Sequence, residues 1–328
     1  MKEMFKNYNL QLFANPNTQT TASAGLSDEM KIYYSDYLID NAEPNLVHDQ
    51  FGQKHPIPKN GGKTIEFRKF VPLGKALTPI QEGVTPDGKS LSVTKIEATV
   101  DQYGDYVTLS DLVQLTAIDN MLLETTKLLG HQAGQTLDTV TREVLNGGTS
   151  VIYAGGKEAR ASLDDTCKLT VTDIYKAARF LKTQNAPKIE GGYVAIIHPD
   201  VAYDLMRDEE WVDVHKYSAT KEIFEGEIGK IAGVRFVETT EAKIFADGGA
   251  DNRDVYSTLV LGANAYGVTE LTGGGLQHIV KQLGSGGTSD PLNQRGTAGW
   301  KATKVAERLV ETYMVRIESA SSFESGAN

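Results

Sequence analysis

The stretch "SDLVQLTAIDNMLLETTKLLGHQAGQTLDTVTREVLN", residues 110–146, carries the strongest helical pattern in the chain. Its apolar residues recur every three or four positions, with one gap of seven, as expected for one face of an α-helix. They are Leu112, Leu115, Ile118, Leu122, Leu129, Ala133, Leu137, Val140 and Val144. Ser110 can cap the start, and Gly147 can supply the left-handed residue that ends a helix. At about 1.5 Å per residue the predicted helix is about 55 Å long, far beyond a typical globular helix.

The segment before this helix, residues 61–110, has the pattern of a long β excursion. Two β-type segments, Thr64–Val71 and Ser90–Leu109, flank a middle rich in proline and glycine. An isolated two-stranded hairpin is marginal in water, so such an element needs support from elsewhere. We therefore predict a projecting hairpin that a second surface stabilises.

Residues 170–300 alternate between helical and strand patterns. In "GGYVAIIHPDVAYDLMRDEEWV", residues 191–212, the run 193–197 is typical of a buried strand, and Pro199 suits the first position of a helix. Asp200 then falls in the first turn, where a negative charge meets the positive end of the helix dipole. His198 and Asp200 could belong to a reactive site, but a strand-to-helix corner explains every residue and is the favoured interpretation.

The stretch "KATKVAERLVETYMVRIESA", residues 301–320, fits two structures. Helical spacing connects Ala306, Leu309, Val310, Tyr313 and Ile317, whereas the β-branched and aromatic content favours strands. Periodicity leaves both structures open.

Composition limits the class of protein. The 328 residues, 40% hydrophobic and 23% charged, suit a folded protein of one large or two moderate domains. A net charge of −10 argues against a free-standing nucleic-acid binder. The single cysteine, Cys167, excludes an intrachain disulfide and a cysteine-based zinc site. The polar residues 1–27 cannot order themselves alone, and we expect proteases to cleave them in free subunits but not in an assembly.

Targeting and catalytic signals are weak. Neither a secretory signal nor an apolar stretch of about 20 residues is present, which predicts a cytosolic product and no membrane partner. "NGGKT", residues 60–64, lacks the first P-loop glycine, because Ile57 stands there, and a strand rather than a helix is predicted next. The histidines have no metal-ligand spacing, and no G-x-S-x-G elbow occurs. We therefore predict no catalytic, cofactor-binding or metal-binding residues, and no cofactor.

Charge is distributed unevenly between the hairpin and the long helix. Residues 59–75 contain five basic residues against Glu66, whereas residues 110–146 contain five acidic residues against two basic ones. Both could be solvated faces, or the hairpin of one subunit could complement an acidic surface of another. The second interpretation gives these candidates for contacts between subunits: Lys63, Arg68, Lys69, Lys75, Asp119 and Glu124.

The order of these elements resembles that of a known family. The stretches that carry the likeness are "NLQLFA" (9–14), "GGKTIEFRKF" (61–70), "IIHPDVAYDLMRDEEW" (196–211), "EGEIGKIAGVRFVET" (225–239) and "DPLNQRGTAGWK" (290–301). Together they resemble the major capsid protein of tailed bacteriophages, with the Hong-Kong-97-type capsid fold, and most closely its N-four-like branch. The likeness spans nearly the whole chain.

The resemblance implies an α+β fold with a set division of the chain. The final segment would return to the peripheral domain as β-strands, and the corner at His198 would lie in the axial domain. The implied parts are an N-terminal arm (1–51), an extended hairpin loop (52–107), a peripheral domain with a long spine helix (108–169), an axial domain (170–285) and the return to the peripheral domain (286–328).

The same resemblance implies a structural function rather than an enzymatic one. Hexamers and pentamers of the protein would close an icosahedral shell around double-stranded DNA, which would be held without sequence-specific binding. The expected partners are further copies of the chain, a portal protein and a separate scaffolding protein, since no helical leader of about 100 residues is evident. The protein would be made in the cytoplasm of a bacterial host and end in the virion. Two alternatives are an encapsulin-like shell that holds cargo enzymes and a soluble α/β enzyme.

Overall fold

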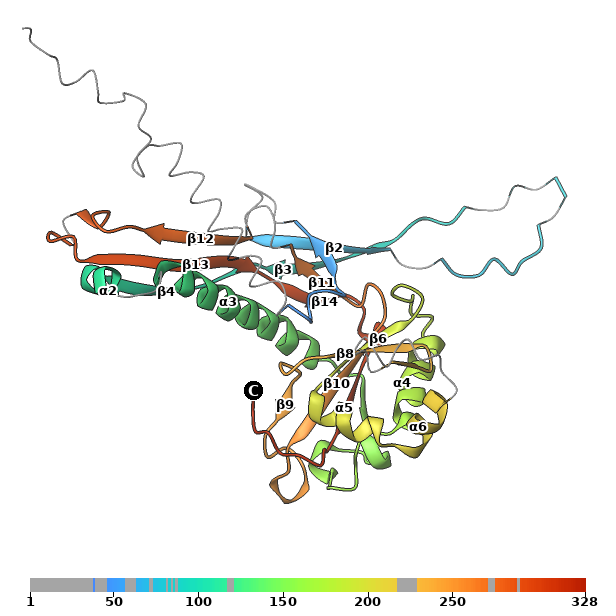
Figure 1. Cartoon of the computed structure of the whole chain (residues 1–328). Coiled ribbons are helices and arrows are strands. Elements are labelled where there is room, and N and C mark those ends of the chain that lie inside the picture. The colour runs from blue at the N-terminus through green and yellow to red at the C-terminus, as the bar shows by residue number, and fades with distance from the viewer. Residues whose placement is uncertain are drawn as a thin grey trace, which may run out of the picture.

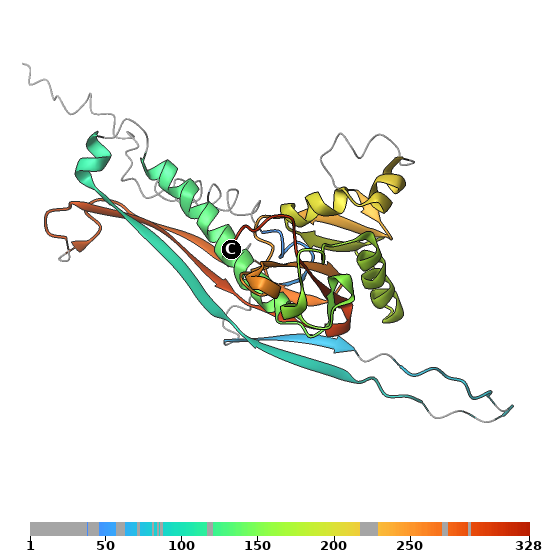
Figure 2. The same cartoon turned by 90° about the horizontal axis from the view of Figure 1, so that it is seen from below.

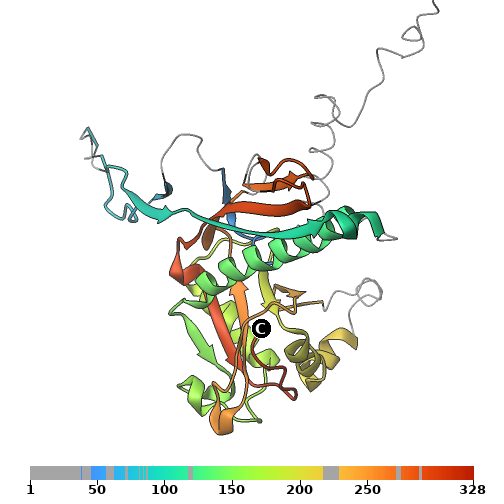
Figure 3. The same ribbon diagram turned by 90° about the vertical axis from the view of Figure 1, so that its left-hand side faces the viewer.

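The computed structural model describes residues 38, 46–56, 63–70, 73–80, 82–83, 85, 88–116, 121–216, 229–270, 275–287 and 290–328. These residues form an elongated layer of strands with a long helix along it, joined at one end to a rounder α/β half (Figures 1 and 3). The predicted protease-sensitive segment, residues 1–27, lies outside the described residues.

Within the predicted helix over 110–146 the structure describes two helices, α2 (Asp111–Thr116) and α3 (Met121–Asn146), and residues 117–120 between them lie outside the described residues. The 26 residues of α3 span about 39 Å. Leu129, Ala133 and Leu137 are buried as the periodicity predicted. Leu112 and Leu115 are instead 65% and 84% exposed, because α2 lies at the far end of the elongated layer (Figure 2).

The elongated layer is a three-stranded antiparallel sheet with α3 on one face. Its order is β12 (Leu276–Lys281), β13 (Arg295–Lys304) and β4 (Asp101–Ser110). The inner side chains of β12 and β13, Leu276, Ala298, Trp300 and Ala302, pack with the apolar face of α3. Trp300 also donates its indole N–H to Gln132 of α3 at 3.2 Å. This core fixes the direction of the helix relative to the sheet.

Two further sheets lie at the base of the hairpin. Strands β2 (Thr64–Phe70) and β3 (Val93–Thr99) pair antiparallel, which confirms the predicted hairpin. Next to them lies a small sheet of β1 (Gln53–His55), β11 (Tyr266–Thr269) and β14 (Ala306–Arg308). Phe67 is 1% exposed and packs with Ile65, Ala98 and Val305. Gly267 makes room for it, because a Cβ there would collide with the Phe67 ring.

The rounder half is built on a seven-stranded sheet. Its order is β5 (Val151–Tyr153), β15 (Met314–Ser319), β10 (Val255–Leu261), β6 (Tyr193–Ile197), β8 (Val234–Glu238) and β7 (Lys230–Ile231), with β9 (Ile244–Phe245) also paired to β10. Helices α4 (Val171–Thr183), α5 (Pro199–Met206) and α6 (Glu209–Lys216) belong to this half (Figure 1). Short 3₁₀ turns cover residues 154–156, 160–162, 250–252 and 311–313.

The corner between β6 and α5 is a helix cap, as favoured from the sequence. The ring of His198 accepts a hydrogen bond from the backbone N–H of Asp200 at 3.2 Å, and Pro199 opens the helix. Asp200 in turn accepts a hydrogen bond from the Tyr256 hydroxyl at 2.8 Å. The side chains of His198 and Asp200 therefore both take part in holding the helix on the sheet.

The ambiguous segment 301–320 forms strands, in agreement with the resemblance. Strand β13 ends at Lys304, β14 follows, and all six residues of β15 are buried. Of the five residues with helical spacing, Ala306 lies in β14, Tyr313 in a 3₁₀ turn and Ile317 in β15, so the spacing there was coincidental. The predicted return segment, 286–328, is shared between sheets, since β15 pairs with β10 in the rounder half. The five domain ranges remain predictions.

Candidate functional site: the projecting hairpin and its buried anchor

The part of the hairpin beyond β2 and β3 projects away from the body of the molecule (Figures 1 and 2). Its large apolar side chains face solvent: Leu73 is 56%, Leu77 83%, Ile80 75% and Leu91 71% exposed. Soluble monomers rarely expose clusters of this kind, and such clusters mark surfaces that bind other proteins. The projecting limb is therefore the first candidate for an assembly surface.

Basic side chains at the base of the limb share one carboxylate. Arg68 donates two hydrogen bonds to Glu66, at 3.2 and 3.1 Å, and Lys95 of the opposite strand donates one at 2.8 Å. These hydrogen bonds, from Lys95 first and then Arg68, lower the pKa of Glu66. Glu97 stands directly opposite Glu66 in the pairing register, so this face of the hairpin base carries two basic and two acidic side chains.

The structure places four of the six predicted contact residues on surfaces that a neighbour could reach. Lys63 and Lys75 are exposed beside β2 and on the limb, and Arg68 is exposed on β2. Glu124 is exposed in the first turn of α3. The fifth residue, Lys69, lies on β2, but its side chain is outside the described residues, as is Asp119.

The basic hairpin and the acidic start of α3 do not meet within one subunit. They lie at opposite ends of the elongated layer (Figures 1 and 2). The predicted complementarity is thus available only between two copies of the chain, and it stays a prediction.

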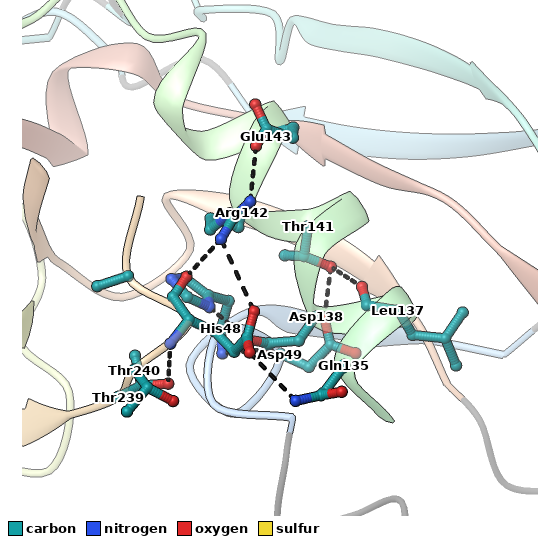
Figure 4. A network of polar contacts seen from close by, with 12 residues as sticks. His48, Asp49, Gln135, Leu137, Asp138, Thr141, Arg142, Glu143, Thr239 and Thr240 are labelled. Carbon is teal, nitrogen blue, oxygen red and sulfur yellow. Dashed lines mark hydrogen bonds and ion pairs between the residues drawn. The ribbon is translucent and has the colours of Figure 1, made fainter. Parts of the chain in front are cut away.

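A buried polar network holds the segment that leads into the hairpin (Figure 4). Asp138 of α3 accepts the backbone N–H of His48 at 2.7 Å, and its second oxygen lies 2.7 Å from Nδ1 of the same histidine. Both side chains are fully buried. A pair of this kind is strongly directional, so it fixes residues 46–50 against the middle of the helix.

The next residue extends the network to the sheet. Asp49 accepts a hydrogen bond from Thr141 of α3 at 2.6 Å and is paired with the buried Lys304 of β13. Tyr266 of β11 donates its hydroxyl to the His48 carbonyl. Burial, with added effects of Asp49 and Asp138, raises the pKa of Tyr266 well above its usual value. Hydrogen bonds and an ion pair from α3, β11 and β13 therefore hold the chain in place just before it enters the hairpin.

Arg142 joins α3 to the rounder half. It is 2% exposed and donates to the Glu241 carbonyl at 2.9 Å, to Glu143 at 3.1 Å and to the Asn328 carbonyl at 3.0 Å (Figure 4). Lys243 donates to the same Glu143 carboxylate at 2.7 Å. Arg142 and Glu143 of α3 are in this way connected by hydrogen bonds to the rounder half of the molecule.

Sequence reasoning missed this network. Asp138 and Arg142 stand one helical turn apart on a helix whose neighbouring face is apolar, which is the only local signal for buried charge. The partners of these residues lie 90 residues away for Asp138 and 99 for Arg142. No spacing rule connects them.

Within the described ranges, no group of three or more histidine, cysteine or acidic side chains is arranged to hold a metal ion. No described helix is both long and apolar enough to cross a membrane. Cys167 is a buried free thiol.

Comparison with known proteins gives a consistent family and fold. Residues 93–308 match the family described as phage capsid protein, and no curated protein matches the chain. The structure is similar to the capsid of Ralstonia phage GP4, with 17% identity, a TM-score of 0.66, and coverage of 82% of this chain and 86% of that one. The capsid of Cyanophage P-SCSP1u is similar with 15% identity and a TM-score of 0.65, and the match covers 84% of this chain and 89% of that one. The Cyanophage Pam1 capsid is similar with 13% identity and a TM-score of 0.61, and the match covers 79% of this chain and 86% of that one.

Proposed function

Since this chain belongs to the phage capsid protein family and is a major capsid protein with the Hong-Kong-97-type fold, we propose that hexamers and pentamers of it close an icosahedral shell around double-stranded DNA. The observation that carries this proposal is the hairpin. Its base is packed into the body, and its outer limb exposes apolar residues that the described part of the subunit does not cover.

The hairpin of one subunit binds the next subunit in this proposal. Contact with a neighbour would remove Leu77 and Ile80 from water, and the basic limb would approach the acidic start of α3. The contact joins two different surfaces of the same chain, and such head-to-tail contacts generate closed rings when the rotation between copies closes. Hexamers and pentamers are two closures of this kind.

The family match favours this function over the two alternatives. An encapsulin-like shell would share the architecture, but the chain belongs to the phage capsid family. A soluble α/β enzyme is disfavoured, because the His198 corner is occupied with structural hydrogen bonds. We therefore propose that the chain has no catalytic role and no cofactor.

Further partners follow from the assignment to a virion shell. They are a portal protein, a separate scaffolding protein and packaged DNA that the shell holds without reading its sequence. Assembly would start in the cytoplasm of a bacterial host. A net charge of −10 suits a wall that contains DNA without binding it tightly.

Electron microscopy of the purified protein tests the proposal directly. The protein would be produced alone and together with the candidate scaffolding protein of its phage. We expect closed shells of uniform diameter in the second case and irregular or no shells in the first. A folded monomer that forms no shells under either condition would contradict the assembly function.

A further inference from the structure

The sheet face opposite α3 contains a groove that the proposed function does not use. It has a volume of about 620 Å³ and is lined by residues of β4, β12 and β13 and by Ser285, Gly286 and Asp290, which follow β12. The pairing register places Tyr106 of β4 beside Gly299 of β13, and Ile279 of β12 on the other side of the same glycine. The floor of the groove is thus a row across three strands.

The floor is shaped for an apolar side chain. Tyr106 is 69% and Ile279 42% exposed, and between them Gly299 presents only backbone. A Cβ at Gly299 would lie 2.7 Å from Cβ of Tyr106, and one at Gly104 would lie 2.7 Å from the Trp300 carbonyl oxygen. Both glycines thus allow the strands to approach closely, and Gly299 adds no side chain between the aromatic ring and the branched aliphatic chain. Such a concave apolar surface can hold one aromatic or aliphatic group.

The rim of the groove is basic. Lys281, Arg295 and Lys301 line it, and no acidic residue occupies an outward-facing position of the three strands in this register. Two carboxylates also line it, but both are engaged. Asp105 accepts hydrogen bonds from Gln132 and from the backbone N–H of Tyr106, and the buried Asp290 accepts the backbone N–H of Arg295. A cationic rim on a chain of net charge −10 is a local exception.

We propose that this groove binds an acidic peptide segment of a partner protein, with an aromatic or aliphatic residue on its floor and flanking carboxylates on the lysines. Charge complementarity selects this occupant. The basic limb of a neighbouring hairpin would be repelled by the rim. A DNA backbone would use the cations but leave Tyr106 and Ile279 in water, since phosphates offer nothing apolar. The proposal concerns a surface separate from the hairpin contact and goes beyond shell closure.

Fluorescence anisotropy with a labelled hexapeptide, Glu-Glu-Phe-Glu-Glu-Leu, tests the proposal on the full-length protein. The comparison probes are Lys-Lys-Phe-Lys-Lys-Leu, Glu-Glu-Ser-Glu-Glu-Ser and a short DNA duplex. We expect the first peptide to bind most tightly and its affinity to fall with added salt, because the rim charges are exposed and screened. Equal binding of the lysine peptide, or tighter binding of the duplex, would overturn the proposal.

Variants separate the two parts of the groove. Lys281→Glu with Lys301→Glu turns two attractions into repulsions and should weaken the acidic peptide about 30-fold at low salt. Tyr106→Ser should weaken it about tenfold at every salt concentration, because the lost contact is apolar. Lys188→Glu, an exposed lysine on the rounder half, is the matched control and should change binding less than about twofold.

Circular dichroism and electron microscopy of the same variants complete the test. Folded Lys281→Glu/Lys301→Glu protein that forms normal shells but loses peptide binding would support the groove and leave the shell function standing. Unchanged peptide binding by this double variant would overturn the groove proposal, whether or not shells form.

Discussion

The projecting hairpin and the seven-stranded sheet differ in the solvent exposure of their apolar residues. Every residue of β10 is buried, with Val260 and Leu261 at 0% exposure, whereas Leu77 and Ile80 on the hairpin are 83% and 75% exposed. Both regions are β-structure of the same chain. The sheet completes its core within one subunit, and we propose that a second subunit covers the apolar surface of the hairpin. In this proposal different residues are responsible for stability and for assembly.

Between these regions lies the network around α3, which belongs to the subunit and yet supports the hairpin. His48 and Asp49 are held by Asp138, Thr141 and Lys304 just before β1. On the return limb, β3 is followed by β4, which pairs along its whole length with β13. Both ends of the hairpin are thus fixed, and only its outer part is free to fit a neighbour.

The largest effect is expected from Leu77→Ser with Ile80→Ser. Burial of such side chains contributes about 1.5–3 kcal/mol each, so every contact between subunits loses up to about 3–6 kcal/mol. The unfolding free energy of the subunit should change by less than about 0.5 kcal/mol, since both residues are exposed there. Sedimentation would report lost shells, and chemical denaturation would report an unchanged subunit.

Tyr175→Ser is the matched control for that pair. Tyr175 is 51% exposed on α4, in the rounder half. Shells should form normally with this change. Lost shells from Tyr175→Ser, or normal shells from the hairpin variant, would contradict the claim that exposed apolar residues matter for assembly on the hairpin but not on the rounder half.

Asp138→Ala should have the next largest effect, on the subunit itself. The change leaves the backbone N–H and the ring of His48 buried without their partner. A buried polar group left without its hydrogen-bond partner typically costs about 1–3 kcal/mol. Denaturation with urea should show this loss, whereas Glu124→Ala, exposed on the same helix, should shift the unfolding free energy by less than about 0.5 kcal/mol. Equal effects of the two changes would show that the network does not support the hairpin's base.

How much the sequence could reveal follows from the same contrast. The hairpin limbs, the apolar face of α3 and the His198 corner rest on local patterns, and the structure bears them out. The exposure of α2 was missed, because Leu112 and Leu115 continue the apolar periodicity and yet are 65% and 84% exposed. Periodicity states which face is apolar, but not whether anything packs on it.

The network was beyond sequence reasoning for a related reason. Asp49 and Lys304 are 255 residues apart, and their pairing depends on how β13 and α3 are assembled. The placement of β15 beside β10 has the same origin, since a buried strand shows no preference for one neighbour in its own residues. The contact candidates on the hairpin and on α3 concern a second copy and remain untested.

A smaller effect is expected from Arg68→Glu with Lys69→Glu. Exposed charge pairs contribute only about 0.2–1 kcal/mol each, but the contact recurs in every copy of a closed shell. Assembly should weaken at low salt and recover in part at high salt, where charges are screened. Light scattering across a salt series would measure this, with circular dichroism to confirm a folded subunit. Normal assembly at low salt would mean that the basic limb is only a solvated face.

The smallest effects belong to the corner on the sheet, where Asp200→Asn should cost about 0.3–1 kcal/mol, the usual range for a charge in the first turn of a helix, and His198→Asn should cause only a modest loss of stability. Burial lowers the pKa of His198 below 6.5, against an opposing effect of Asp200. The unfolded chain then binds the proton more readily, so this contribution to stability is present above pH 6.5 and is lost as the pH falls below it. His198→Asn should remove that part of the pH dependence, and its thermal unfolding between neutral and mildly acidic pH should change less than that of the unaltered protein. Shells should form normally with either change, because the corner is bonded to Tyr256 inside the subunit. A loss of shells without a loss of stability would contradict this, because it would show that the corner takes part in a contact between subunits.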